Sequence, residues 1–461
     1  MPIARRRIAI PLRARVGRHA STGAQCQNWA EDQQIVIALL NLIPRNEGGA
    51  EAGITGRVVG GIASDALCSA ILTFQKKYFP AHQTGFIEPT GAAIAKLEEL
   101  AARPSPTPAA APAGPWGVFQ SKSVSKALRE ALANDHHLNH VEVVEILRAT
   151  LQDGRVTQSE LADLKMISEK SNTIMPRSKT MLERFVDQAG TMIAKWPFDV
   201  SSVQRSYAVG RACDFMRKLG RAQWPNLDRD EVGIGIIIRV AYPGTLDQNQ
   251  TNLCGPAALV FNVLRDRPGT YAAFACDMYD KGEGVLYRLP IKPKADLRHA
   301  APSSSDIAPV DWLTLASIRN SNDWAIHYDS TGGGFSGMTT PMELAYWFGQ
   351  AGYTDVREDA NFFRHQRDTD NMKEANRLLA AGYHVVLLIG SNMVDGHQTQ
   401  SSDIRDDHWV VLQSEMKLEN GEVRFHIYTW GNGYREVPLS GTLTLGDFLM
   451  NYYGYVAAKP Y

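Results

Sequence analysis

Residues 248–264 read QNQTNLCGPAALVFNVL, a polar segment that becomes an apolar run after Cys254. The run has the composition of a buried helix. Pro256 suits the first turn of such a helix, because its missing N–H would be unpaired there, and Gly255 permits a tight turn. The sequence therefore predicts that Cys254 opens a helix, where the helix dipole favours a thiolate over a thiol. The alternative is a small buried cysteine that happens to precede a helix.

Three further features suggest partners for this cysteine. Residues 406–412, DDHWVVL, place His408 at the start of an apolar run typical of a buried strand. Gln248 lies six residues before Cys254, and its side-chain amide could stabilise an oxyanion on an attacked carbonyl. Residues 428–434, YTWGNGY, follow another short predicted strand. The order of these segments favours a cysteine-nucleophile enzyme over a structural cysteine.

Together the segments resemble the papain-like cysteine peptidases, most closely their bacteriocin-leader-processing branch. The resemblance rests on the Gln-x5-Cys spacing, the helix opened by the cysteine, the His-Trp-Val-Val-Leu sequence and the Trp-Gly turn after the next strand. It covers roughly residues 230–461. His408 also lies close to the family's separation of roughly 130–150 residues after the cysteine. The resemblance implies an α+β domain with a helix packed on an antiparallel sheet, Cys254 as nucleophile, His408 as base and Gln248 at the oxyanion.

The third catalytic residue remains open at this stage. In papain-like enzymes an Asn or Asp orients the histidine and often lies two residues before the Trp of the Trp-Gly turn, a position that Tyr428 holds here. A tyrosine hydroxyl can accept a hydrogen bond from imidazole, but it carries no charge to stabilise imidazolium. Asn432 is chemically suitable but follows the Trp, and Asp406 and Asp407 are further candidates. The site is expected to be a triad completed by one of these residues, or a Cys–His dyad.

Length and composition constrain the other function classes. The chain has 461 residues, 44% of them hydrophobic and 21% charged, and a net charge of -1. Several domains are expected, because single cores stop growing near ~250–300 residues. The near-neutral charge does not support a nucleic-acid or membrane-surface partner, and no segment approaches the ~20 apolar residues of a membrane span. Five irregularly spaced cysteines form neither a disulfide framework nor a zinc pattern. We therefore expect folding in a reducing compartment, without metal or cofactor.

The N-terminal quarter contains two predicted regions. Residues 1–25 are basic and lack the uninterrupted apolar core of a secretory signal, so they are expected to form a disordered leader. Residues 26–102 are expected to form a small unit of three helices. This unit resembles the peptidoglycan-binding domain of many bacterial cell-wall enzymes. The features it shares are an Ala-Ile-x-x-Phe-Gln helix at 70–75 and a Gly-x-Ile-x-Pro-x-Gly turn at 85–91. A different small helical bundle with Gly-rich turns is the alternative.

The middle of the chain is expected to connect the two recognisable ends. Residues 103–118 are rich in proline and alanine and are typical of an extended linker. Residues 119–229 are predicted to be helical, with a degenerate EF-hand-like loop at 149–160. Ala149 and Leu151 stand where a calcium loop needs oxygen ligands, which predicts a helix-loop-helix scaffold without metal.

Within residues 230–461, the pattern predicts strands and helices that lead to the site. The segment 233–240, GIGIIIRV, is predicted to be a strand entering it. A helix at 371–381 is expected to run into a buried strand at 384–389, and the chain then reaches His408.

These expectations combine into one function. The protein is expected to be a cysteine amidohydrolase that cleaves peptide bonds, with peptidoglycan as its substrate. His408 either takes the Cys254 proton during attack or holds it in a thiolate–imidazolium pair. A wall-binding module without a signal peptide suggests an antibacterial effector made in a bacterial cytoplasm. It would be exported by a machine such as type VI secretion and act in the target periplasm. Its expected partners are an immunity protein and a component of the secretion apparatus. The alternatives are a protease or deamidase with a protein target, and an inactive wall-binding protein.

Overall fold

The computed structural model describes residues 12, 14–18, 26–28, 30–43, 45–50, 54, 62–101, 119–133, 137–170, 173–218, 222–249, 251–302, 307–321, 339–361, 365–395, 407–430 and 433–460. The chain is an α+β protein that divides into two compact units, Met1–Cys213 and Asp214–Tyr461. The predicted boundary at residue 229 lies further along the chain than this division. In the described part of the chain, no helix combines the length and apolar character needed to cross a membrane.

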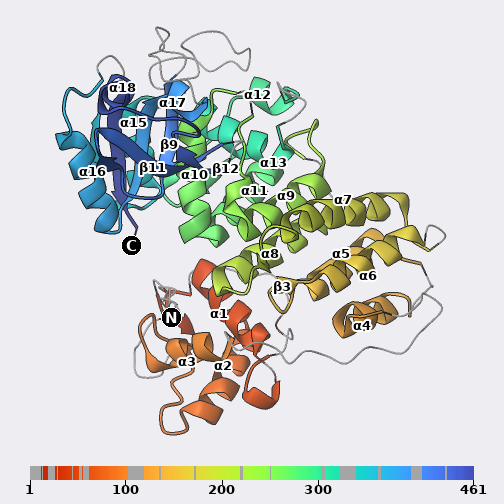
Figure 1. Ribbon diagram of the computed structural model, residues 1–461. Coiled ribbons are helices and arrows are strands. Elements are labelled where there is room, and N and C mark those ends of the chain that lie inside the picture. Colours follow the sequence, from red (N-terminus) through yellow and green to blue (C-terminus); the bar gives the residue numbers. More distant parts are fainter. Residues whose placement is uncertain are drawn as a thin grey trace. The chain divides into compact units, whose positions relative to one another are not determined.

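The first unit begins with three helices around a common apolar core, drawn in red and orange in Figure 1. They are α1 (Ala30–Leu42), α2 (Asp65–Tyr78) and α3 (Ala92–Ala101). The buried residues of α2 recur at helical spacing, which places its apolar side chains on the face that meets α1. Ser64 caps α2 by accepting a hydrogen bond from the Leu67 N–H at 3.2 Å.

Part of the expected leader is folded into this core. Leu12, Ala14 and Val16 are buried, and β1 (Val16–Gly17) pairs antiparallel with β2 (Phe86–Ile87). Apolar and polar residues alternate from Leu12 to Val16, which is the pattern of a half-buried strand. The polar positions are arginines, which gave the segment the composition of a basic tail. The prediction of a disordered segment is therefore wrong for these residues. The following parts of the predicted leader and linker lie outside the described residues: 1–11, 13, 19–25 and 103–118.

Helices and one small strand pair account for the rest of the first unit. The helices are α4 (Lys122–Ala131), α5 (His140–Thr150), α6 (Gln158–Glu169), α7 (Pro176–Ile193) and α8 (Val203–Met216), the last of which runs on into the second unit. The strands are β3 (Arg155–Val156) and β4 (Phe198–Asp199), which pair antiparallel.

The EF-hand-like loop uses its acidic residues in local structure. Asp153 accepts a hydrogen bond from the Arg155 N–H at 2.9 Å. Glu160 closes a capping box with Thr157 at the start of α6. Both carboxylates are thus engaged by the backbone of the loop and of the helix start, in the manner of caps.

An antiparallel sheet of seven strands forms the centre of the second unit. Its order is β10-β11-β9-β8-β13-β7. The seventh strand, β12, lies off this path and pairs with β11. The strands are β7 (Thr354–Ala360), β8 (His384–Gly390), β9 (Asp407–Leu412), β10 (Lys417–Glu419), β11 (Glu422–Thr429), β12 (Gly433–Val437) and β13 (Tyr452–Lys459).

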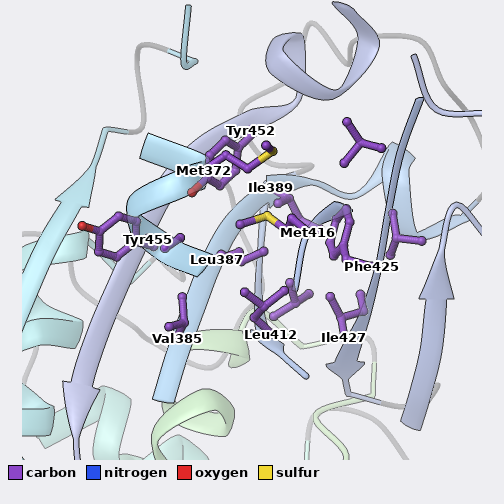
Figure 2. Close-up of a cluster of buried hydrophobic side chains, with 14 of the residues drawn as sticks. Met372, Val385, Leu387, Ile389, Leu412, Met416, Phe425, Ile427, Tyr452 and Tyr455 are labelled. Carbon is purple, nitrogen blue, oxygen red and sulfur yellow. The ribbon is translucent and has the colours of Figure 1, made fainter. Parts of the chain in front are cut away.

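One face of this sheet carries a large apolar cluster of the unit. It is covered by α16 (Asp370–Ala380) and α18 (Leu445–Met450), and every second residue of β8 points into it. Figure 2 shows Met372 of α16 above the strand side chains, close to the ring of Tyr452. Ile427 of β11 belongs to the same cluster. Because side chains alternate along a strand, the neighbours of Ile427 in β11 point to the opposite face of the sheet.

The helix opened by the cysteine, α10 (Cys254–Asp266), packs against β9. Figure 1 shows it in green beside β9 and β12. Its Phe261 ring stacks on the ring of Tyr428, with centroids 3.8 Å apart and planes 6° apart. Tyr428 follows Ile427 in β11, so its side chain leaves the sheet on the face opposite the core of α16. The helix therefore covers that second face.

The remaining elements of the second unit are short or pack around α10. They are α9 (Arg229–Ala241), α11 (Pro268–Lys281), β5 (Gly284–Leu286), β6 (Leu289–Ile291), α12 (Ala295–His299), α13 (Pro309–Asp311), a π-helical turn (Trp312–Ala316), α14 (Ser317–Ser321), α15 (Pro341–Gln350) and α17 (Asn392–Asp395).

The segment 233–240 was predicted to be a strand, and it is the central part of helix α9. Its residues are buried on all sides, so no apolar stripe reveals the helical period. Gly233 and Gly235 stand where Met216 and Val310 approach the helix backbone closely. The glycines are needed because neighbouring side chains pack directly against the helix backbone. This packing outweighs the low helix propensity of glycine.

Candidate active site

Cys254 is the first residue of α10, and its side chain is 9% exposed. The prediction that this cysteine opens a helix is confirmed. Gly255 follows because Thr339 presses against it: a Cβ at position 255 would lie 2.3 Å from the Thr339 Oγ1 atom. Pro256 then occupies the first turn, where its missing N–H costs nothing. Local sequence thus fixes the cysteine at the helix terminus that faces β9.

The surroundings of Cys254 favour a neutral thiol in the resting protein. Burial raises the pKa of the Cys254 thiol above its ordinary value. Hydrogen bonds from the backbone N–H groups of Trp409 and Gly255 oppose this rise, as does the positive charge of Arg319, but they do not cancel it. The contribution of the Trp409 N–H also shows that the sulfur lies next to the strand segment that contains His408.

His408 is the second residue of β9 and pairs with Ile389 of β8. Burial lowers its pKa to about 4, so the imidazole is neutral at pH 7. Its Nε2 atom lies 2.8 Å from the Oγ1 atom of Thr429. When Nε2–H donates this bond, the lone pair is on Nδ1, which is then the ring nitrogen that can accept a proton.

Thr429, which was not among the predicted candidates, binds the imidazole, and the candidate Tyr428 is engaged elsewhere. Tyr428 uses its hydroxyl to donate a hydrogen bond to the Leu246 carbonyl oxygen at 2.8 Å. Successive residues of a strand point to opposite faces, so Tyr428 turns toward α10 while Thr429 shares the face of Ile427. No sequence motif identifies Thr429. The alternation of side chains along β11 would have identified it only if the face on which His408 lies had been known.

Two indoles fix the place where β9 and β11 separate. The pairing of these strands ends at Val411 and Tyr428. Beyond that point, Trp430 donates from Nε1 to the Trp409 carbonyl oxygen at 2.9 Å. Trp409 in turn donates from Nε1 to the Thr339 carbonyl oxygen at 2.8 Å. Trp430, the first residue of the predicted Trp-Gly turn, therefore helps to hold the strand segment that carries His408.

Gln248 lies in the loop before α10 and is 8% exposed. Its Oε1 atom is buried and has no hydrogen-bond partner among the described residues. Burial of an unpaired amide oxygen costs free energy. A hydrogen bond from a bound group would remove this cost. Amide O and N positions are interchangeable by a flip, which makes the Nε2–H group available to an oxyanion.

The other predicted candidates cannot be placed. Asn432 and Asp406 lie outside the described residues, and of Asp407 only the backbone, which begins β9, is described. The described residues hold no group of three or more metal-ligating side chains. Comparisons with protein-family models, with curated proteins and with solved structures find no match for this chain.

Proposed function

We propose that the protein is a cysteine amidohydrolase that acts by nucleophilic acyl transfer. One observation carries the proposal: the sulfur of a cysteine at a helix N-terminus lies next to the backbone N–H of Trp409, the residue that follows a histidine whose Nε2 atom is bound by Thr429. A nucleophile, a base and a group that orients the base are the parts that such chemistry needs. Gln248, whose Oε1 atom has no hydrogen-bond partner among the described residues, would add a donor for the oxyanion if its amide is flipped.

The reaction starts from a neutral thiol and a neutral imidazole. His408 takes the thiol proton on Nδ1 as the sulfur of Cys254 attacks the carbonyl carbon. The negative charge moves to the carbonyl oxygen, which accepts hydrogen bonds from the Gln248 amide and the Cys254 backbone N–H. When the tetrahedral intermediate collapses, His408 returns the proton to the leaving amine. Water then hydrolyses the thioester, again with His408 as base, and regenerates the thiol.

The substrate we propose is the peptide part of peptidoglycan. The support is the first unit, whose α2 and the turn after it carry the motifs that resemble wall-binding domains. An amidohydrolase joined to such a module fits an antibacterial effector that acts in the periplasm of a target cell. Export by a dedicated secretion apparatus and an immunity protein in the producing cell belong to the same proposal.

Digestion of purified peptidoglycan tests this function. The wild-type protein should release muropeptides with cleaved peptide bonds, identified by mass spectrometry, and Cys254→Ala should release none. Cys276→Ala is the matched control, because this cysteine is also buried but lies within α11 and not at the start of α10. Release by Cys254→Ala would overturn the cysteine mechanism. Absence of release by the wild type would favour a protein target, and failure of Cys254 to react with any acylating reagent would favour the inactive wall-binding protein.

A further inference from the structure

We propose that the buried pair of Arg239 and Asp311 is a positioning device that holds the Gln248 loop ready for the oxyanion. This inference rests on the proposed function and extends it to two residues far from the reacting atoms in sequence. Asp311 is the central positioning residue, since it binds both the arginine and the loop.

The pair joins α9 to α13 by two hydrogen bonds. Arg239 donates from Nε to Oδ1 of Asp311 at 3.1 Å and from Nη2 to Oδ2 at 2.6 Å. Asp311 is fully buried and Arg239 is 7% exposed. A buried ion pair seldom stabilises a fold more than apolar side chains of the same size, because both charges lose their hydration. The pair therefore calls for a reason other than stability.

That reason is visible at the second oxygen of the carboxylate. Oδ2 of Asp311 also accepts a hydrogen bond from the backbone N–H of Asp247 at 3.1 Å. Asp247 immediately precedes Gln248. Arg239 holds the Asp311 carboxylate in place, and this carboxylate binds the backbone of Asp247. The loop is therefore anchored one residue before Gln248, whose amide we propose to bind the oxyanion.

A second anchor and a strained residue complete the loop. Tyr428 donates to the Leu246 carbonyl oxygen at 2.8 Å, so the loop is held from β11 as well. On the other side of Gln248, Asn249 has a φ of 53°, in the left-handed region, and donates its N–H to Asp247 Oδ1 at 2.7 Å. Such a conformation persists only where surrounding contacts enforce it. The anchors therefore fix in advance the direction of the Gln248 amide.

Two reactions of Cys254 separate this role from general support of the fold. Alkylation by iodoacetamide joins sulfur to the methylene carbon and expels iodide, without forming an oxyanion. Acylation by p-nitrophenyl acetate passes through a tetrahedral oxyanion before p-nitrophenolate leaves. Only the second reaction gains from a positioned amide. The ratio of the two rates on the full chain reports the positioning, with Cys254→Ala as the baseline for both.

Three variants remove the anchors in different ways. Asp311→Asn removes the charge, and Tyr428→Phe removes one hydroxyl while keeping the stacked ring. The double variant Arg239→Met with Asp311→Leu replaces the pair by apolar groups and leaves no unpaired buried charge, so it protects against a failure to fold. A double variant of similar design at another ion pair, Arg229→Met with Asp280→Leu, is the control, because this pair does not bind the loop.

We expect the anchor variants to acylate about 10–100-fold more slowly while alkylation changes by less than about twofold. The control should leave the ratio of the rates unchanged. Equal slowing of both reactions in the anchor variants, or an unchanged ratio in folded variants, would overturn the inference while the proposed function stands. A wild-type protein that is alkylated but not acylated at Cys254 would overturn both.

Discussion

At the scale of single residues, the important property of the proposed site is that Cys254 and His408 are both uncharged at rest. Burial raises the pKa of the Cys254 thiol and lowers that of the His408 imidazole to about 4. Both shifts disfavour the thiolate–imidazolium pair that was one of the two sequence-based expectations. The proton is then transferred during attack, and an imidazole held by a neutral threonine suits this role.

The pH dependence of acylation follows from this state. Protonation of His408 removes the base, so the rate of acylation by p-nitrophenyl acetate should fall as the pH decreases through the folded pKa of about 4. Activity should accordingly be retained at pH 5.5, where a histidine with the ordinary pKa of roughly 6.5 would be mostly protonated. A pH–rate profile measures this directly. An acidic limb centred near the ordinary histidine pKa would contradict it.

Replacement of Thr429 tests what orients the base. Thr429→Val keeps the size of the side chain but removes the oxygen bound to His408 Nε2. We expect turnover to decrease roughly 10–10³-fold, less than for loss of a carboxylate, because a neutral hydroxyl stabilises imidazolium only weakly. Thr429→Ser keeps the oxygen and should retain most of the activity. Equal rates for Thr429→Val and the wild type would indicate a Cys–His dyad or an orienting role for Asp406, Asp407 or Asn432.

The residues that we propose as catalytic differ in how far sequence alone could single them out. Cys254, His408 and Gln248 are marked by local signals, namely a helix start, a strand start and a fixed spacing. Thr429 carries no such signal, because its role depends on which face of β11 it shares with His408. Parity of that kind depends on pairing between strands distant in sequence.

At the scale of secondary structure, helix α9 shows where composition misleads. Its centre is rich in isoleucine and contains Gly233 and Gly235, which favours a strand by propensity alone. Tertiary packing decides otherwise, since a helix buried on every side needs no polar face. By contrast α10, α16 and β8 were predicted close to their observed bounds, α10 from its Gly-Pro start and β8 from its short apolar run.

The close contact of Gly235 with Val310 can be measured as a coupling. A Cβ at position 235 would lie 2.7 Å from Cγ1 of Val310, a distance that side chains do not tolerate. Gly235→Ala should gain about 1 kcal/mol of helix propensity but lose about 1–3 kcal/mol through overpacking, for a net loss of stability. In the double variant with Val310→Ala much of the overpacking should disappear. Denaturant unfolding of the four proteins gives the coupling, and strict additivity would refute the contact.

At the scale of the whole molecule, the chain divides into two compact units, the first of which takes in both the predicted region 26–102 and most of the predicted helical region 119–229. Composition could not predict the residue at which one unit ends and the next begins, because helix α8 continues across this boundary. Nor could it predict that part of the basic N-terminal region is folded. Leu12 and Val16 belong to the core of α1–α3, as does Val203 at the start of α8. The first unit thus includes residues on both sides of the predicted linker.

Wall binding by the first unit is the prediction that belongs to this scale. A full chain carrying Cys254→Ala, which should not digest the wall, is expected to co-sediment with insoluble peptidoglycan. The same chain without residues 1–118 should remain mostly in solution. The assay should include about 0.5 M salt, because the arginine-rich N-terminus would otherwise be attracted to wall carboxylates, and salt screens such contacts.

The truncation carries a useful internal check. Removal of residues 1–118 uncovers Val203, which packs with the α1–α3 core and is 7% exposed in the full chain. A newly exposed apolar residue favours adhesion to surfaces, so this side effect would increase sedimentation and cannot imitate the expected loss. For the corresponding truncation with Cys254 intact, an iodoacetamide alkylation rate equal to that of the full chain shows that the second unit is still folded, because unfolding would expose this buried thiol and speed its alkylation. If the truncated chain sediments as well as the full chain, the first unit is not the wall-binding part. If neither chain sediments, peptidoglycan gives way to a protein target, and the two-unit chain must use its first unit for another purpose.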